Sequence, residues 1–524
     1  MRSTPAAACS VSAEGAPGLR GLQASVTPDR VFTIAVAAMV LHLVARTPIA
    51  DPDLGWQLRV GEWIWQHGGL PATDPFGYPN AGRPWVVYSW LGELVFWLLA
   101  SHMGVHALVL ACATLVAATF VVVLRASREA GAAPTAAYAA TIVAAVATAP
   151  YTSERPGMAS FLLAAVYARA LLRWRRGASG APWMLVPLMA LWVNVHVFFV
   201  FGIAWLWAVV IWTAAESAIV RHAAPDRRWR GLLAVAVAAS VVTLLNPYGW
   251  RLLAHVVEIS HHPVAIPVIV EFSSPDFHAA GLFVLPLLLA LITALATGTE
   301  RPDAFLTVLV AGHLALALIT QRYVPLLAIV AAPLVGRSLT TALRLDPDGA
   351  ARLSGRHAVA HAAIAAGFVL LAATAAPTAA ALEPNLRSGE FPVDAVRFLR
   401  RQPNLGRLVN SFNWGGYLIY ALYPDYQVSM DGRTTVYGED ETRSYMDMHF
   451  VRDGWRPYLA HWHPDVVLWE RHGALAVALG DSPDWVRVYA DDTAVVFLRA
   501  DHPLRAEIEA AAEGPAVWRN LDAG

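Results

Sequence analysis

Residues 105–124 read VHALVLACATLVAATFVVVL, and this stretch decides the fold of the chain. It contains no Asp, Glu, Lys or Arg, and as an α-helix it reaches about 30 Å, the thickness of the hydrocarbon core of a bilayer. A helix in lipid satisfies its own backbone hydrogen bonds, which an irregular segment exposed to lipid cannot do. The stretch therefore predicts a helix that crosses a membrane.

Apolar runs of similar character recur along the chain up to about residue 380. The 524 residues are 57% hydrophobic and 15% charged, whereas soluble proteins carry about 25% charged residues. We expect a disordered tail over residues 1–30 and a mostly α-helical transmembrane domain over residues 31–380, with about 11–13 helices. The candidate spans are 31–47, 86–101, 105–124, 133–150, 157–173, 182–195, 197–215, 231–246, 280–297, 303–320, 323–342 and 357–380.

The charged residues indicate partners and orientation. The 38 Lys and Arg residues and 39 Asp and Glu residues give a net charge of −1, which argues against nucleic acid and leaves membrane lipid as the expected partner. Three Arg-rich segments are expected on the cytoplasmic side: 173–176, 227–230 and 344–356. The last span then carries a C-terminal domain, residues 385–524, to the outer side. The loop 48–85 lies there too if 86–124 crosses the membrane once or contains a re-entrant helix.

Two loops between the spans have the composition of folded surface segments, 48–85 and 246–279. In the first loop, apolar residues such as Trp56 and Trp63 recur at helical spacing and predict an interfacial helix at 54–67. Trp and Tyr favour the membrane–water boundary, where the ring is half buried and its polar edge stays wet. We expect both loops to lie on the outer side.

The C-terminal domain is expected to have a small α/β fold, because strand and helix patterns alternate there. Strand patterns occur at 407–412, 427–430, 465–469, 485–489 and 494–498. Helical patterns occur at 415–422, 439–450, 454–462 and 472–479. A pair of aspartates, Asp491 and Asp492, predicts a hairpin turn between the last two strands.

The first candidate site is Asp51-Pro52-Asp53, directly after the first apolar run. Pro52 favours an extended backbone at Asp51, and residues two apart in an extended chain face the same side. Both carboxylates could hold one divalent cation, or one could act as a base beside a bound acceptor. Alternatively, Asp53 caps the helix at 54–67 and Asp51 is solvated.

Polar residues within or beside the apolar runs form the second candidate site: Glu93, Glu154, Arg155, Asn194, His196 and Arg322. An ionised group in hydrocarbon costs several kcal/mol unless it is paired or wet, so such residues usually face a cavity. A cavity that holds Arg155, Arg322 and His196 would suit a phosphate, because guanidinium groups match phosphate oxygens. The alternatives are an ion pair between Glu154 and Arg155, or arginines that reach the membrane surface.

A third group, His255, Glu258 and His262, lies on one helical face. Zinc requires three or four such ligands in tetrahedral array. The spacing lacks two histidines four residues apart, and Pro263 would end the helix. Histidines at the membrane surface are the simpler interpretation, and the sequence assigns no metal.

The C-terminal domain offers Asn413, Asp431 and Arg433 as ligand-binding candidates in loops that follow strand patterns. Such loops carry the ligand groups in many α/β domains. Asp431 and Arg433 could bind a sugar or could pair with each other, and the structural interpretation is favoured. The glycines at 415 and 416 could let a backbone approach a ligand, or could form a tight turn.

Several of these motifs resemble a family of bacterial membrane proteins, over about residues 48–499. The matching segments are Asp51 to Leu58, Gly61 to Ile64, Asp74 to Phe76, Trp85 to Glu93, Arg155-Pro156, Trp192 to His196, Asn246 to Gly249, Glu271, Trp414 to Tyr417, and Asp431 to Arg433. The sequence departs from the family pattern at Gly55, where Trp is expected, and at Val197, where Gly is expected. The layout is similar to that of the GT-C glycosyltransferases, which include protein O-mannosyltransferases and aminoarabinose transferases.

The resemblance implies a transferase that takes a sugar from a polyprenyl-phosphate-linked donor. It implies that Asp51 or Asp53 acts on the acceptor or on a cation, and it suggests Arg155 and Arg322 for the donor phosphate. The acceptor would be a glycan, a lipid or a protein at the outer face of the bacterial cytoplasmic membrane. Two other functions fit the same pattern, a transporter or flippase for a lipid-linked or small polar substrate, and a non-catalytic scaffold that displays the C-terminal domain.

Overall fold

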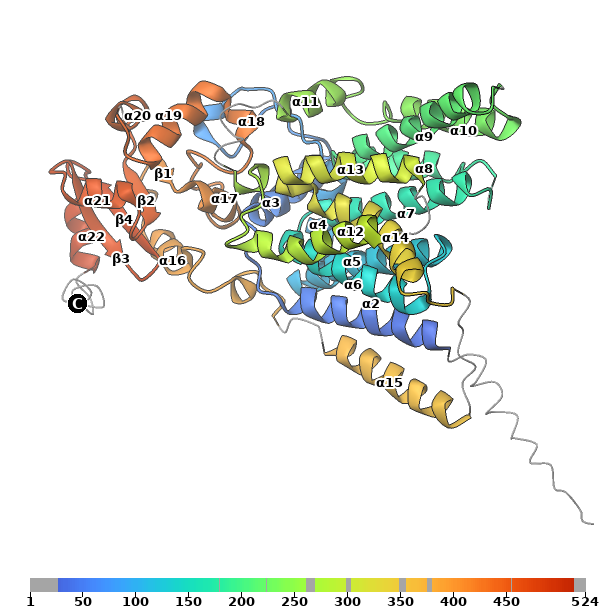
Figure 1. Cartoon of the computed structure of the whole chain (residues 1–524). Coiled ribbons are helices and arrows are strands. Elements are labelled where there is room, and N and C mark those ends of the chain that lie inside the picture. The colour runs from blue at the N-terminus through green and yellow to red at the C-terminus, as the bar shows by residue number, and fades with distance from the viewer. Residues whose placement is uncertain are drawn as a thin grey trace, which may run out of the picture.

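The structure is a computed structural model, and it describes residues 27–178, 180–222, 224–260, 269–297, 303–347, 355–374, 379–453 and 455–512. A bundle of helices forms the larger part, and a smaller α/β part lies at one end of it (Figure 1). Most of the predicted tail at 1–30 lies outside the described residues.

Every predicted span is a helix. The helices are α2 (Pro28–Arg46), α4 (Trp90–Met103), α5 (Val105–Glu129), α6 (Pro134–Thr148), α7 (Gly157–Arg175), α8 (Leu185–Val195), α9 (Phe199–Ile219), α10 (Arg227–Val242), α12 (Leu285–Thr297), α13 (Ala304–Ile319), α14 (Val324–Ala342) and α15 (Gly355–Ala373). Among the described residues, α5, α9 and the segment Gln321–Ala342 are long and apolar enough to cross a membrane. For the shorter helices, membrane crossing stays a prediction.

Small residues at the centre of the bundle allow its helices to pack closely. At Gly336 of α14, a Cβ would lie 3.1 Å from Ala132 Cβ, so a larger side chain would separate the two chain segments. Thr340 accepts a hydrogen bond from the Ala133 N–H at 2.8 Å. The bundle therefore has a close-packed interior.

Large apolar side chains cover the outside of the bundle. Ile211, Val241, Leu245, Leu289 and Ile292 are each more than 60% exposed, although soluble proteins rarely expose extended apolar surface. Such a surface is stable against lipid rather than water. The helical part is therefore that of a membrane protein.

The C-terminal part contains a four-stranded mixed sheet with the order β1-β2-β4-β3. Its strands are β1 (Leu408–Asn410), β2 (Val466–Glu470), β3 (Trp485–Ala490) and β4 (Ala494–Arg499). β1 and β2 are parallel, and β4 is antiparallel to β2 and to β3, so the predicted hairpin at Asp491 and Asp492 is confirmed.

The predicted strand at 427–430 is wrong. Val428 forms one isolated bridge with Gly77 of the first loop. Its N–H donates to the Phe76 carbonyl at 3.0 Å and its carbonyl accepts from the Tyr78 N–H at 3.3 Å. Because these partners come from a distant loop, the segment does not join the sheet.

All four predicted C-terminal helices are present, and three further helices accompany them. The helices are α16 (Val393–Arg401), α17 (Gly415–Leu422), α18 (Thr434–Tyr437), α19 (Glu439–His449), α20 (Trp455–Trp462), α21 (Ala474–Gly480) and α22 (Arg505–Ala512). Gly415 begins α17 with no space beside it, because a Cβ there would lie 2.2 Å from the Met430 carbonyl oxygen. The glycine at 415 therefore lets two segments of the protein itself pack closely, which neither of the two alternatives from the sequence described.

The helix predicted at 54–67 is α3 (Leu54–His67), and it joins the bundle to the C-terminal part. Its start crosses the start of α17 so closely that a Cβ at Gly55 would lie 2.3 Å from the Gly416 carbonyl oxygen. Glycine at 55 is therefore required by this contact. The crossing holds the Asp51-Pro52-Asp53 motif between the two parts of the molecule.

Candidate functional site

The two aspartates of the first motif are both turned into the protein. Asp51 is 5% exposed, and its carboxylate accepts the backbone N–H of Asp53 at 2.8 Å. Asp53 lies at the N-cap position of α3, but its carboxylate accepts the Trp56 indole N–H at 3.0 Å and caps no backbone group. The alternative in which Asp53 caps the helix and Asp51 is solvated is therefore wrong.

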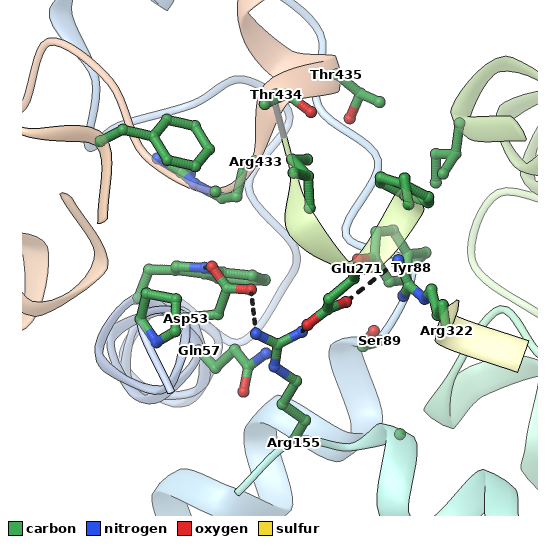
Figure 2. A pocket seen from close by; sticks show the side chains of 18 of the residues that line it. Asp53, Gln57, Tyr88, Ser89, Arg155, Glu271, Arg322, Arg433, Thr434 and Thr435 are labelled. Atoms are coloured by element: carbon green, nitrogen blue, oxygen red, sulfur yellow. Dashed lines mark hydrogen bonds and ion pairs between the residues drawn. The ribbon is translucent and has the colours of Figure 1, made fainter. Parts of the chain in front are cut away.

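Both carboxylates contact the guanidinium of Arg155, which lies between α6 and α7. Arg155 Nε pairs with Asp51, Nη2 lies 3.4 Å from Asp53, and Nη1 pairs with Glu271 of the short helix η3 (Val270–Phe272). Figure 2 shows the pairs with Asp53 and Glu271. The cation that the two aspartates share is therefore an arginine, and the predicted alternative pairing of Glu154 with Arg155 is not formed.

Arg322 reaches the same cluster from the segment between α13 and α14. Its Nη1 lies 3.9 Å from Glu271 Oε2, which is a loose ion pair. The guanidinium also lies over the rings of Phe198 at 5.5 Å and Phe272 at 5.3 Å. Whereas three carboxylates surround Arg155, Arg322 has hydrogen-bonding capacity left for a ligand.

Two cavities meet at this cluster. The first, of about 450 Å³, is lined by Asp53 and extends between α3, α4 and the C-terminal part; we call it the Asp53 cavity. The second, of about 360 Å³, is lined by Asp51 and by apolar side chains of α2 and α7; we call it the Asp51 cavity. Three of the candidate residues, Arg155, His196 and Arg322, line both cavities, and so does Glu271.

His196 presents one ring nitrogen to the cavities. Its Nδ1 lies 3.1 Å from the Ser160 hydroxyl, which in turn accepts the Trp192 indole N–H at 2.8 Å. The Phe198 N–H also points at His196 Nδ1, at 3.4 Å. Because Nδ1 accepts these bonds, the ring proton sits on Nε2, and His196 can donate to a ligand oxygen.

Asn194, two residues earlier, has a structural role. Its side chain accepts the Trp90 indole N–H at 2.9 Å and donates to the carbonyls of Ala190 at 2.8 Å and Leu245 at 2.9 Å. The amide group is therefore satisfied within the protein, and Asn194 is absent from the lining of both cavities.

The electrostatics of the cluster follow from burial and from the two arginines. Burial raises the pKa of Asp53 to about 6, although Arg155 opposes the shift. Burial and the neighbouring Asp51 raise the pKa of Glu154 to about 7. Burial would also raise the pKa of Glu271, but Arg155 and Arg322 hold it below the usual value. Burial therefore brings the pKa of Asp53 close to neutral pH.

Glu93 and Gln57 line the Asp53 cavity from α4 and α3. Glu93 is 1% exposed, and Gln57 lies on the same helix face as Asp53 and points toward Arg155 in Figure 2. Gln57 and Glu271 were not assigned as site residues from the sequence. A signal for Gln57 was present, because it is a polar residue one helical turn after Asp53, beside the apolar face of the helix.

Arg433 and Asp431 form a buried ion-pair cluster with Asp74 of the first loop. Arg433 donates to Asp431 at 2.8 and 2.6 Å and to Asp74 at 2.7 and 3.3 Å. The Tyr437 hydroxyl donates to Asp431 at 2.6 Å, and the Trp85 ring lies 4.6 Å from the guanidinium. The predicted alternative in which Asp431 and Arg433 pair with each other is observed. The pair with Asp74, which was not predicted, fastens the first loop to the C-terminal part.

The remaining candidates are more peripheral. Asn413 is exposed and lines the Asp53 cavity on the wall that the C-terminal part forms. His255 pairs with Glu258 at 3.0 Å, and His262 lies outside the described residues. Over the described ranges, no three His, Cys, Asp or Glu side chains are placed to hold a metal ion. Between Asp51 and Asp53, the position that a divalent cation would take is filled by the guanidinium of Arg155.

Two solved structures are similar to this chain in the arrangement of their elements. The crystal structure of ArnT from Cupriavidus metallidurans bound to undecaprenyl phosphate is 15% identical, with 89% of this chain and 97% of that chain covered and a TM-score of 0.46. A structure of the arabinofuranosyltransferase AftD from Mycobacteria is 13% identical, with 89% and 41% covered and a TM-score of 0.47. This chain thus spans less than half the length of AftD. No protein-family model and no curated protein matches the chain.

Proposed function

We propose that the protein is a membrane glycosyltransferase that moves a sugar from a polyprenyl-phosphate-linked donor to an acceptor hydroxyl. One observation carries the proposal: Asp53 faces one cavity, while Arg322 and His196 face both cavities where these meet. A base on one side and phosphate-binding donors at the junction are the groups that this reaction requires. The layout of the sequence is similar to that of GT-C glycosyltransferases, which supports the same reaction.

The donor occupies the Asp51 cavity in this proposal. Val44 of α2 and Phe161 of α7 line that cavity, and such apolar side chains suit a lipid-linked ligand. The donor phosphate lies at the junction, where the guanidinium of Arg322 and the Nε2–H of His196 bind its oxygens. Both groups stabilise the negative charge that grows on the phosphate as the sugar leaves.

The acceptor occupies the Asp53 cavity. Its hydroxyl oxygen attacks the anomeric carbon of the donor sugar, and the bond from that carbon to the phosphate oxygen breaks with its electron pair going to the phosphate. The hydroxyl proton passes to the carboxylate of Asp53. A pKa of about 6 suits this step, because Asp53 is ionised at neutral pH and still accepts a proton readily.

Arg155 positions the base rather than the phosphate. Its guanidinium is engaged by Asp51, Asp53 and Glu271, so a phosphate would have to displace a carboxylate to reach it. Asp51 is fully buried as a side chain and holds Arg155 in place. Asp51 is therefore a positioning residue, and Asp53 is the catalytic one.

The proposal includes the layout inferred from the sequence. Residues 31–380 form the transmembrane domain, and residues 385–524 form a domain at the outer face of the bacterial cytoplasmic membrane. The distribution of Arg supports this orientation. A membrane-impermeant thiol label measures this orientation in intact cells. A single cysteine is introduced at the exposed Asp501, and Cys9 and Cys112 are replaced by alanine.

The experiment uses the protein in lipid nanodiscs with polyprenyl-phosphate-linked glucose, mannose, galactose or arabinose, and a bacterial membrane extract as acceptor. Released polyprenyl phosphate is measured. One donor should be consumed, and Asp53→Asn should lower the rate about 10²–10⁴-fold. The control Asp501→Asn makes the same chemical change at an exposed position and should leave the rate unchanged.

Two results would overturn the proposal. Full activity of Asp53→Asn would show that Asp53 is not the catalytic base. Movement of an intact labelled donor across proteoliposomes, with no polyprenyl phosphate released, would show a flippase instead.

A further inference from the structure

Three walls of the Asp53 cavity carry polar atoms that have no hydrogen-bond partner within the described ranges. They are Gln57 Oε1 on α3, Glu93 Oε2 on α4 and His449 Nδ1 on α19. Gln57 is 6% exposed and Glu93 is 1% exposed, so bulk water does not solvate these side chains. Nearly all buried polar groups in proteins are paired, and three unpaired atoms around one cavity indicate a ligand that pairs with them.

The chemistry of the three atoms restricts that ligand. An amide oxygen accepts hydrogen bonds, whereas a carboxyl oxygen and an imidazole nitrogen accept or donate according to their protonation. The three atoms belong to three different helices, so the ligand must offer hydrogen-bonding groups at several points on its surface. An ammonium group offers its donors at one point, whereas a sugar ring carries hydroxyl groups around its edge.

The other groups of the cavity agree with a neutral, hydroxyl-rich ligand. Tyr88, Ser89, Thr434 and Thr435 line it with hydroxyl groups, and their side chains face the cavity in Figure 2. Arg433 lines it as well, but its charge is already matched by two buried carboxylates. An acyl chain would offer no hydrogen bond to these hydroxyl groups or to the unpaired atoms of Gln57, Glu93 and His449.

We infer that the Asp53 cavity is the acceptor subsite and that the acceptor is a carbohydrate, bound through its hydroxyl groups by Gln57, Glu93 and His449. The inference rests on the proposed function and selects one of the acceptor classes, glycan, lipid or protein, that the sequence left open. The volume of about 450 Å³ lies in the range of small-molecule sites.

Direct binding tests the inference without turnover. Methyl glycosides of glucose, mannose, galactose and arabinose are titrated into the protein in nanodiscs, and saturation-transfer difference NMR reports binding. A Ser- and Thr-containing hexapeptide and glycerol are titrated in the same way. At least one glycoside should bind saturably, and the peptide and glycerol should not.

The substitutions locate the site. Gln57→Leu and Glu93→Gln should each weaken glycoside binding. The loss should be about tenfold for Gln57→Leu, because this change removes the amide oxygen that accepts a hydrogen bond. Gln66→Leu makes the same change on an exposed position of α3 and should leave the affinity unchanged. Tryptophan fluorescence and size-exclusion profiles that match wild type show that each variant is folded.

Each outcome decides the inference. Binding of the peptide alone, absence of binding by every glycoside, or glycoside binding that Gln57→Leu and Glu93→Gln leave unchanged would overturn it. Glycoside binding without donor consumption would overturn the proposed function and leave the carbohydrate site intact. Donor consumption without glycoside binding would overturn the carbohydrate site alone.

Discussion

Removal of the Arg433 guanidinium should loosen the junction between the first loop and the C-terminal part. The side chain is 3% exposed, and the carboxylates of Asp74 and Asp431 are both fully buried. Arg433→Met deletes four side-chain hydrogen bonds and leaves two carboxylates with no cation between them. Breaking one buried ion pair in this way costs about 3–5 kcal/mol.

The magnitude converts into a thermal shift. For a domain of roughly 150 residues, each kcal/mol of lost stability lowers the melting temperature by about 2–4 °C. The C-terminal part should therefore melt about 6–20 °C lower. Tryptophan fluorescence follows the transition, and hydrogen exchange in α3, α18 and the segment around Asp74 should accelerate. A second change, Asp74→Asn in the Arg433→Met background, should recover part of the loss because it removes one stranded charge.

A matched control is available on the surface. Arg397 is 52% exposed and pairs with Glu383 and Asp394, so Arg397→Met should leave the melting temperature nearly unchanged. Equal thermal shifts for Arg433→Met and Arg397→Met would refute the structural role of the Arg433 cluster.

Three further predictions concern the site and the helix crossing beside it. Because burial raises the pKa of Asp53 to about 6, the carboxylate is protonated below that pH and cannot act as the base. The kcat/KM for donor consumption should therefore fall as the pH drops through about 6. A flat profile between about pH 5 and 7 would contradict the assignment of Asp53 as the base. Arg322→Gln should lower kcat about 10²–10³-fold and raise the donor KM in steady-state assays. Arg322→Lys should recover part of this loss. Unchanged donor kinetics would exclude phosphate binding by Arg322. Gly55→Ala places a Cβ 2.3 Å from the Gly416 carbonyl oxygen, so thermal unfolding should show a loss of about 1–3 kcal/mol; Gly69→Ala, which meets no atom within 4 Å, should show no such loss.

The helices could be predicted because their signal is local. Each apolar run is long enough to identify a helix by itself, and α3 was predicted with its observed bounds, Leu54–His67, from the spacing of its apolar residues. The strand predicted at 427–430 failed for the opposite reason. A strand requires a partner, and Val428 takes its partners from the loop at Phe76 and Tyr78, a choice that no local pattern contains.

In the candidate site, too, the local features could be predicted from the sequence and the contacts between distant residues could not. The extended motif predicted that Asp51 and Asp53 could hold one divalent cation, and in the structure the cation that contacts both carboxylates is the guanidinium of Arg155. The identity of that cation depends on Arg155, about a hundred residues further along the chain, and spacing within the motif cannot reveal it. The alternative in which Arg155 pairs with Glu154 is not observed, because three other carboxylates converge on the same guanidinium.

The position of Arg155 also separates the two aspartates in function. Asp51 and Asp53 are two residues apart, yet Asp51 lines only the cavity beside α2 and α7, and Asp53 lines only the cavity beside α3 and α4. Arg155 lies on both cavities, so its guanidinium forms part of the wall between them. If a donor and an acceptor occupy the two cavities, the reacting bond must cross that wall next to Arg155. The negative charge of Asp53 is then balanced by Arg155, and the phosphate is left to Arg322, whose only paired carboxylate within the described residues is Glu271 at 3.9 Å. Glu271→Gln removes the carboxylate that Arg155 and Arg322 share. The pKa of Asp53 should fall, because the charge of Glu271 helps to raise it, and the donor KM should change through Arg322. A pH profile and a donor KM measure these two effects separately.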